Sequence, residues 1–293
     1  MRYGIPEFRL PIEILDSEIS DILDLGIDLK SGRVLSTDIT LDQLSSDGYD
    51  AVFLGVGARE SRRIPFEGCH VSDVLWGVEF LHRVTAGERI KLQDRVVVIG
   101  GGNMAVDVAT TALRCGASHV TMACLECLDE MPASIRELQK SKAEGVEVMP
   151  SWGPESVISE AGKLTRMDLR RCTRVFDAQG QFCPEFSKTR ECIPTDQVIV
   201  AVGQTSDLSF LLDDSQIKVE RGLIVVNEDS LETSMKGIYA GGDIVNTPGA
   251  IIDAIAAGRK AAASIDKTIG GSGDINEVLF PRGNPDAYLG RDE

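Results

Sequence analysis

The sequence predicts an α/β protein of about two domains, organised around one βαβ unit. The β-branched run Val96 to Ile99 leads straight into glycines and a small-residue helical pattern, and Ser118 to Ala123 supplies a second strand. Short apolar runs of this kind are typical of parallel strands that are buried on both faces. A length of 293 residues is enough for about two domains. Two further strand-into-glycine patterns, Tyr49 to Gly57 and Gln197 to Gly203, indicate where the chain leaves one domain and returns.

The glycines after the first strand have the spacing of a dinucleotide-binding loop. In Gly100-x-Gly102-x-x-Ala105, the first glycine permits a tight turn, the second lets a pyrophosphate approach, and alanine permits close helix–strand packing. The helix N-terminus then offers free N–H groups and partial positive charge to phosphates. The alternative is a glycine turn between core elements, and the βαβ context favours nucleotide binding. The candidate residues of this loop are Gly100, Gly101, Gly102, Asn103, Met104 and Ala105.

Composition excludes several classes of protein. The apolar content of 43% and charged content of 26% are typical of a globular domain. A net charge of −16 argues against nucleic acid or an anionic membrane as a partner. No apolar run is long enough to span a membrane, and the N-terminus lacks a signal-peptide pattern. The seven scattered cysteines indicate reduced thiols, so we expect a cytoplasmic protein.

The first third of the chain alternates loops with short elements. Gly and Pro make residues 1–11 an extended loop, and an apolar face from Ile12 to Leu23 predicts a helix that ends near Gly26. Thr40 is a candidate helix cap. The other predictions are a strand over 27–30, a helix from Thr40 to Leu44, a strand over 49–54, a domain boundary within 59–68, and a helix over 74–84.

Beyond the βαβ unit the pattern changes from helical to β. We expect a helix over 135–144 that is stopped by Gly145, and a strand over 146–149. From Ser156 to Pro194, short strands separated by turn signals predict an antiparallel meander laid across the sheet of the second domain.

A second candidate site lies near the C-terminus. Gly237 to Asp243 reads as a short strand that ends in a glycine pair and a carboxylate, and a helix of small and aliphatic residues follows from Ala250 to Ile265. Asp243 on such a turn can accept hydrogen bonds from sugar hydroxyls, but it is equally compatible with an N-cap before a core helix. The candidates here, with the glycines of the two crossings, are Gly242, Asp243, Gly249, Ala250, Ile251, Gly57 and Gly203.

These motifs together resemble one family. The chain is similar to the flavin–nicotinamide oxidoreductases typified by the glutamate synthase small (beta) subunit and the matching region of dihydropyrimidine dehydrogenase. The resemblance covers nearly the whole chain. It rests on Arg2 to Pro11, Gly100 to Asn103, Glu130 to Ser134, Ala201 to Gln204 and Thr233 to Asp243.

The resemblance implies two Rossmann-like domains, with the nicotinamide domain inserted in a discontinuous FAD domain. The implied boundaries are 1–62 and 198–270 for FAD, 63–197 for NAD(P), and a linker-like tail over 271–293. Hydride would pass from the nicotinamide to FAD, and electrons would pass on to an iron–sulfur or flavin-domain protein partner. The cofactors carry this chemistry, so we nominate no general acid or base. Asp243 and the helix starting near Gly249 and Ala250 would hold the ribityl–phosphate chain and the flavin O2 edge.

The sequence also departs from the family. The family's FAD-binding GxGxxG unit would precede Met1, so the FAD domain reads as N-terminally truncated, and we expect this chain alone to hold FAD weakly or not at all. Apolar residues such as Ile14 and Ile22 should then be exposed, and exposed apolar patches favour association into an oligomer. Cys124-x-x-Cys127 reads as two incidental thiols. The alternative function is a nicotinamide-binding scaffold or redox-sensing module without bound flavin.

The residues after the second strand favour NADH over NADPH. Relatives commonly carry paired arginines there, which would hold a 2′-phosphate, whereas this chain has Leu125 and Glu126. A carboxylate accepts hydrogen bonds from a ribose 2′-OH and repels a 2′-phosphate. Ala105 stands at the third glycine position, where alanine is often seen with NADP, so it argues for the opposite preference. The alternative interpretation of Glu126 is a solvated loop carboxylate.

Overall fold

The structure is a computed structural model that describes residues 1–211, 216–246 and 249–275. The chain divides into two compact units, each built from two stretches of sequence. The first unit comprises Met1–Ser31 and Arg59–Thr205, and the second comprises Gly32–Ala58 and Ser206–Glu293. Most of the predicted tail, residues 276–293, lies outside the described residues.

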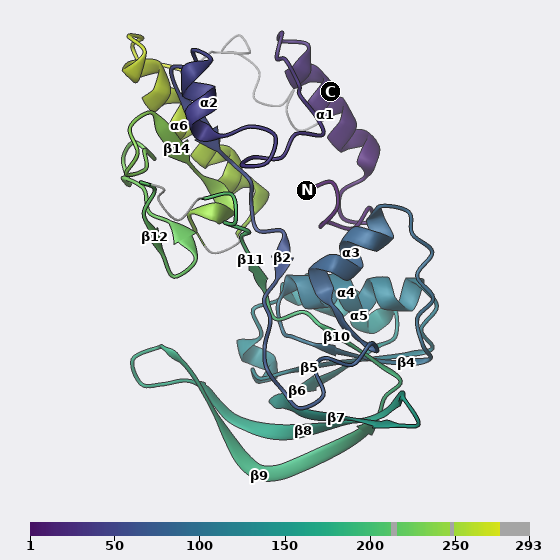
Figure 1. The fold of residues 1–293 in the computed structure, drawn as a ribbon. Coiled ribbons are helices and arrows are strands. Elements are labelled where there is room, and N and C mark those ends of the chain that lie inside the picture. The colour runs from purple at the N-terminus through teal and green to yellow at the C-terminus, as the bar shows by residue number, and fades with distance from the viewer. Residues whose placement is uncertain (212–215, 247–248, 276–293) are drawn as a thin grey trace, which may run out of the picture. The chain divides into compact units, whose positions relative to one another are not determined.

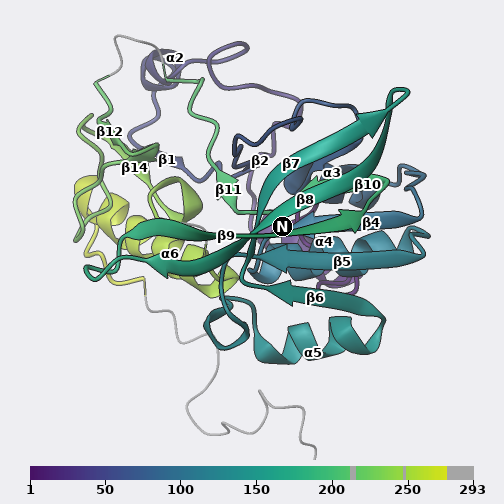
Figure 2. The same cartoon turned by 90° about the horizontal axis from the view of Figure 1, so that it is seen from below.

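The centre of the first unit is a five-stranded parallel sheet with the order β3-β10-β4-β5-β6 (Figure 2). The apolar run around Val96 to Ile99 forms the middle strand, and it is buried because neighbouring strands and layers cover it on all sides. This arrangement confirms the predicted βαβ unit. The strands are β3 (Val74–Trp76), β4 (Arg95–Ile99), β5 (His119–Cys124), β6 (Val146–Pro150) and β10 (Gln197–Val200).

Helices cover one face of this sheet and a second, antiparallel sheet covers the other (Figure 1). Residues of β4 pack against the fully buried Val108 and Ala109 of α4 on the helical side. On the other side, Met167 and Leu169 of the antiparallel sheet are fully buried against it, which confirms the predicted meander. The elements are α3 (Gly77–Thr85), α4 (Asn103–Arg114), η1 (Leu128–Glu130), α5 (Ile135–Ala143), β7 (Trp152–Glu160), β8 (Lys163–Phe176) and β9 (Phe182–Pro194).

A short antiparallel pair lies close to both crossings between the units. Strand β2 (Glu60–Ser61) pairs with β11 (Gln204–Thr205), and the Arg62 N–H donates to the Gly203 carbonyl at 3.0 Å. The two units meet along the chain at residues 58–59 and 205–206.

The second unit has a smaller core around one parallel strand pair. Strand β1 (Val52–Leu54) pairs with β14 (Ile238–Ala240), and the buried Ile224 and Ile244 pack with them. Thr40 caps α2 as predicted, since its hydroxyl accepts from the Gln43 N–H at 3.1 Å. The remaining elements are α2 (Leu41–Ser46), β12 (Val219–Glu220), β13 (Leu223–Ile224), η2 (Gly242–Ile244) and α6 (Ile251–Thr268).

The N-terminal segment groups with the first unit, which differs from the predicted 1–62 domain segment. Residues 1–11 form neither helix nor strand, and α1 (Ile12–Leu23) follows them as predicted. Three contacts hold this segment against helices of the first unit. The Tyr3 ring lies edge-on to His82 with centroids 4.8 Å apart, Arg9 pairs with Asp107, and Arg114 lies 4.1 Å over the Phe8 ring.

Two predicted elements are wrong. Residues 27–30 form no strand, and their apolar side chains Ile27 and Leu29 are exposed, because no neighbouring strand among the described residues pairs with them. The start of the predicted helix over 74–84 is instead strand β3, because its backbone pairs with the distant β10. The helical part begins only at Gly77.

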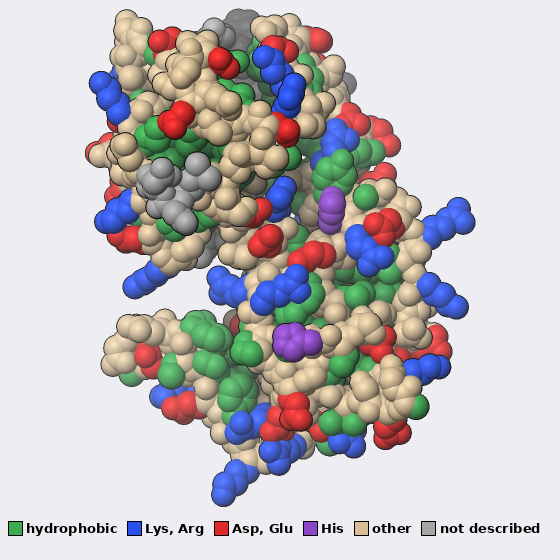
Figure 3. All heavy atoms as spheres, in the orientation of Figure 1, with side chains coloured by type: hydrophobic (Ala, Val, Ile, Leu, Met, Phe, Trp, Pro, Cys, Tyr) green, Lys and Arg blue, Asp and Glu red, His purple; other side chains and the backbone are tan. Residues whose placement is uncertain are grey.

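Apolar side chains remain exposed where α6 begins. Ile252 is 67% exposed and Ile255 is 52% exposed, and among the described residues of this helix only Ala261 is buried. Ile14 and Ile22 are also exposed, as expected from the sequence. Acidic and basic side chains are interspersed on the face shown in Figure 3, so no single-sign patch dominates there. No helix in the described ranges is long and apolar enough to cross a membrane.

The Asp107 carboxyl gives the first unit a defined pH dependence. Burial raises its pKa from 3.8 to about 6, although Arg9 opposes the shift and Glu137 adds to it. Between these two values the folded state binds more protons than the unfolded state, so this group lowers stability as pH rises from about 4 to about 6. Relative to Asp107→Asn, the wild type should therefore lose free energy of unfolding across this window, measured by denaturant unfolding at several pH values.

Asp196→Asn is the control, because the contribution of Asp196 to stability changes with pH in the opposite direction. A hydrogen bond from Arg95 lowers the pKa of Asp196, so its contribution is present at neutral pH and lost in acid. A constant difference between wild type and Asp107→Asn from pH 4 to 6 would contradict the assignment.

Candidate functional site

The glycine loop between β4 and α4 has the geometry of a phosphate cradle. Gly100 has a φ of 145°, and a Cβ there would overlap the Ala201 carbonyl oxygen of the neighbouring strand end. Gly102 is the N-cap of α4 with a φ of −92°, and a Cβ there would meet nothing within 4 Å. The first glycine is therefore required by the fold, while the second borders open space beside the free N–H groups of the helix.

Ala105 serves the packing role that the motif predicts. It is fully buried, and its Cβ lies 3.1 Å from the position that a Cβ of Gly100 would occupy. Met104 is partly buried and packs against the same core. These two residues bring α4 close to β4, so the helix N-terminus is held at the end of the strand.

The segment Glu130 to Ser134 is bonded to the glycine loop. The Ala133 N–H donates to the Gly101 carbonyl at 3.1 Å, and the Ser134 N–H donates to the Asn103 Oδ1 at 2.8 Å. The Asn103 side chain thus holds the neighbouring segment in place. These two bonds give the segment, which contributes to the family resemblance, a structural role.

Glu126 lies against the same loop. Its Oε2 is 2.7 Å from the position of a Cβ on Gly101, and its carbonyl accepts from the Ser151 N–H at 2.8 Å. The side chain is half-buried. The structure therefore brings Glu126 together with the glycines, at the end of the second strand of the βαβ unit, where a ribose hydroxyl would be bound.

The Cys124 and Cys127 thiols differ in environment. Burial, reinforced by the Glu126 charge, raises the pKa of Cys124 to about 12, whereas Cys127 is exposed. A thiol with so high a pKa is a poor nucleophile, which fits the prediction that these are incidental thiols.

The candidates of the second unit gather at the end of β14. Gly242 has a φ of 73°, and the Asp243 Oδ1 accepts from the Gly249 N–H at 3.3 Å. The Ala250 N–H at the start of α6 donates instead to Asp253, at 3.0 Å, so Asp243 is not the N-cap residue of this helix. Ile251 begins the helix and is exposed.

The two crossing glycines fall in different units. Gly203, with a φ of 123°, belongs to the first unit, and Gly57, with a φ of 69°, belongs to the second. Their backbone conformations explain why glycine stands at both crossings.

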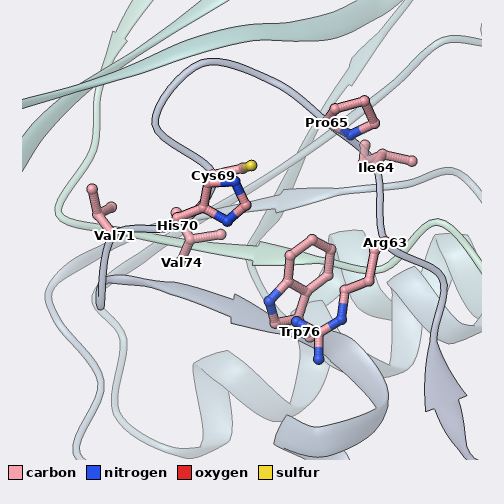
Figure 4. A pocket seen from close by; sticks show the side chains of 8 residues that line it. All are labelled: Arg63, Ile64, Pro65, Cys69, His70, Val71, Val74 and Trp76. Carbon is pink, nitrogen blue, oxygen red and sulfur yellow. The ribbon is translucent and has the colours of Figure 1, made fainter.

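A separate hollow of about 450 Å³ lies at the β3 edge of the first unit (Figure 4). The Arg63 guanidinium lies 4.1 Å over the Trp76 ring and pairs with Glu79 at 3.0 Å. None of the predicted site residues lines this hollow, so it is distinct from the glycine loop. Its lining residues are Arg63, Ile64, Pro65, Cys69, His70, Val71, Val74 and Trp76.

Comparison with known proteins places this architecture in a family. The family model of the pyridine nucleotide-disulphide oxidoreductases matches residues 11–258. The chain belongs to this family. Its resemblance to the glutamate synthase small subunit is confirmed at 34% identity over 283 residues to the glutamate synthase [NADPH] small chain of Escherichia coli.

Two other curated relatives are similar over most of this chain. It is 38% identical over 273 residues to an NADP(+)-dependent formate dehydrogenase subunit beta of Moorella thermoacetica. It is 31% identical over 274 residues to the NAD-dependent dihydropyrimidine dehydrogenase subunit PreT of Escherichia coli. The matches cover 90 to 93% of this chain but only 38 to 60% of the three relatives.

Solved structures confirm the fold class. FprA from Mycobacterium tuberculosis in complex with NADPH superposes with a TM-score of 0.75 at 17% identity, over 92% of this chain and 74% of FprA. Thioredoxin reductase of T. acidophilum gives a TM-score of 0.57 at 23% identity, over 75% of this chain and 66% of that one. The predicted α/β fold of the two-dinucleotide-domain oxidoreductases is therefore correct.

The two glycines of the loop should respond differently to substitution. Gly102→Val has space in the structure, so the protein should fold with a nearly unchanged melting temperature but lose NADH binding, because the side chain occupies the pyrophosphate position. Gly100→Ala should instead destabilise the protein, because its Cβ overlaps the Ala201 carbonyl and its φ is unfavourable for alanine. Calorimetric titration with NADH and thermal unfolding measure the two effects. Equal NADH affinity in Gly102→Val and wild type would reduce the loop to a structural turn.

Proposed function

We propose that this protein is a flavin-dependent oxidoreductase, or a subunit of one, that passes hydride from NADH to FAD and electrons on to an iron–sulfur partner. The observation that carries the proposal is the glycine cradle at the N-terminus of α4, in a chain of the pyridine nucleotide-disulphide oxidoreductase family. The three relatives are named as subunits or chains of larger enzymes, which supports a protein partner.

The residues of the first unit fit a nicotinamide dinucleotide. Gly102 leaves room above the helix N-terminus, and the N–H groups of the first turn of α4 would bind the pyrophosphate. Glu126 would accept a hydrogen bond from a ribose hydroxyl, since its carboxylate lies against the same loop.

The residues of the second unit fit part of a flavin dinucleotide. A Cβ on Gly241 would lie 3.0 Å from the Phe53 ring and 3.1 Å from the Ala257 Cβ, so glycine allows β14 to end directly against α6. Asp243 follows on this turn. Its Oδ2 accepts no hydrogen bond within the described part of the chain and would be available to ribityl hydroxyls.

FAD, when bound, supplies hydride acceptance and onward transfer of single electrons. The side chains of this protein bind and orient; none of them needs to act as a general acid or base. The described residues at the glycine loop offer a carboxylate, a side-chain amide and backbone N–H groups. The Cys124 thiol beside Gly101 is a poor nucleophile, because burial raises its pKa to about 12.

Flavin binding is tested with purified protein that is incubated with FAD and then passed through a desalting column. Because the described residues fit only part of FAD, we expect the retained flavin to be well below one per chain, and NADH should bleach its absorption band under anaerobic conditions. Asp243→Ala should retain less flavin, because the variant loses the carboxylate that would accept hydrogen bonds from the ribityl chain. Asp229→Ala, in an exposed loop of the same unit, is the matched control. NADH binding without any flavin retention would instead indicate a nicotinamide-binding scaffold or redox sensor.

The preference for NADH over NADPH is a further part of the proposal. The relatives' names include both NAD and NADP and so do not indicate which cofactor this chain prefers. We base the preference on the charge of Glu126. The Glu126 carboxylate would lie close to a 2′-phosphate, and the two like charges would repel each other.

Exchange of this charge should reverse the preference. In Glu126→Arg the ratio of NADPH to NADH affinity should rise by about tenfold or more, because a like-charge contact is replaced by an ion pair. Glu147→Arg, at an exposed position near the amino end of β6, makes the same charge change away from the carboxyl ends of the strands and should leave the ratio nearly unchanged. Calorimetry with both cofactors gives the ratio. Tighter NADPH binding by the wild type, or no response to Glu126→Arg, would contradict the assignment.

A further inference from the structure

The strand ends beside Glu126 define where the adenine of a bound dinucleotide would lie. Strands β5 and β6 are parallel neighbours, with Cys124 opposite Pro150 at their carboxyl ends. Dinucleotides bind at this end of a doubly wound sheet. With the pyrophosphate at α4 and the ribose at Glu126, as in the proposed function on which this inference rests, the adenine extends over the β6 end.

The chain turns sharply at that point. Ser151 has a φ of 65°, in the left-handed region, and directs the chain from β6 into β7. Its N–H donates to the Glu126 carbonyl at 2.8 Å, and its carbonyl accepts from the Cys172 N–H at 2.9 Å. These two bonds connect the ribose-binding loop to β8. Trp152 and Arg171, the neighbours of Ser151 and Cys172, are cross-strand partners.

Arg171 differs from the other arginines of β8. Arg166 pairs with Asp168 at 2.8 Å, Arg170 lies 4.0 Å from Glu155, and Arg174 pairs with Glu185. Arg171 is exposed, and no carboxylate of the described residues pairs with it. Its guanidinium lies 5.4 Å from the centre of the Trp152 ring, within the range of a cation–π contact. It is therefore held on an aromatic surface with its hydrogen-bonding groups available.

Backbone hydrogen bonds connect Arg171 to Glu126 through Ser151. The Glu126 carbonyl accepts from the Ser151 N–H, and the Ser151 carbonyl accepts from the N–H of Cys172, the residue after Arg171. Burial raises the pKa of Cys172 most, a hydrogen bond to the Arg174 carbonyl lowers it, and the nearby charges of Glu126 and Glu130 raise it while that of Arg171 lowers it. We expect a ligand that is bound at Glu126 to extend toward the Arg171 and Trp152 pair.

We propose that Arg171, held on Trp152, is the surface on which the adenine ring of the nicotinamide dinucleotide stacks. A guanidinium is planar and stacks on aromatic rings, and stacking on a base needs no particular hydrogen-bond pattern. The adenine is common to NADH and NADPH. The contact is therefore a source of affinity for both, whereas Glu126 distinguishes them at the 2′ position.

The test compares NADH and NADPH affinities of the wild type, Arg171→Ala, Arg171→Lys and Arg174→Ala by calorimetry. Arg171→Ala should weaken both cofactors by a similar factor of about ten, in line with the loss of one stacked base. Arg171→Lys keeps the charge but loses the planar group, so it should weaken binding nearly as much. Arg174→Ala removes an arginine of the same strand that is already paired with Glu185 and should have no effect.

A second measurement locates the adenine directly. The chain has two tryptophans, so a Trp76→Phe background leaves Trp152 as the only one. Addition of NAD⁺ should change the emission of Trp152. Unchanged emission at concentrations where calorimetry shows saturation would overturn the proposal.

The outcomes separate this inference from the proposed function. A loss confined to NADPH would make Arg171 a 2′-phosphate ligand, and unchanged affinities would remove it from the site; either result overturns the adenine platform while leaving nicotinamide binding intact. A wild type that binds neither cofactor would overturn both. Unaltered thermal unfolding in Arg171→Ala and Arg171→Lys shows that an affinity change is local.

Discussion

The first unit depends on one close approach, between the turn at Gly100 and the carbonyl of Ala201. The β4 strand must turn into α4 while the end of β10 passes directly beside it, and no side chain fits between them. The contact joins parts of the chain that are far apart in sequence. It fixes the start of α4, and the free N–H groups of that helix are in turn fixed relative to the sheet. The glycine motif is therefore a packing requirement as well as a candidate phosphate cradle.

The elements that the sequence predicted well are those whose signals are local. The apolar run at Val96 to Ile99, the alanine-rich α4 and the Thr40 cap each carry their pattern within a few residues. Strand β3 was missed because its residues have an equally good helical pattern, and only pairing with the later β10 decides the outcome. The strand predicted at 27–30 failed for the opposite reason, since it has the pattern but lacks a partner.

The candidate site was predictable to a similar degree. The glycines and Glu126 are candidates because motif spacing relative to a strand is visible in the sequence. The contribution that we propose for Trp152 and Arg171 is not visible there, because it depends on the register of β7 against β8 and on the left-handed turn at Ser151. A serine at such a position gives no glycine signal.

The N-terminal segment shows how a charged contact can specify an arrangement at a cost in stability. Arg9 reaches Asp107 in the middle of α4, and Asp107 is nearly fully buried there. Removal of a carboxylate from water opposes its ionisation, so this pair contributes little net stability at neutral pH. The Arg9 Nη2 is itself buried without a hydrogen-bond partner in the described structure. Such a pair is better understood as fixing where the segment lies.

In the function that we propose, recognition of the cofactor separates into positions set by the backbone and selectivity set by side chains. Main-chain groups make the bonds from Ala133 to Gly101, from Ser151 to Glu126 and from Cys172 to Ser151. Because these bonds do not depend on side-chain identity, an arginine could replace Glu126 without a change in the shape of the loop after β5. A charge at that position then alters the response to a 2′-phosphate alone. Affinity that is common to both cofactors has to come from groups outside that loop, which is where Arg171 and the N-terminus of α4 lie.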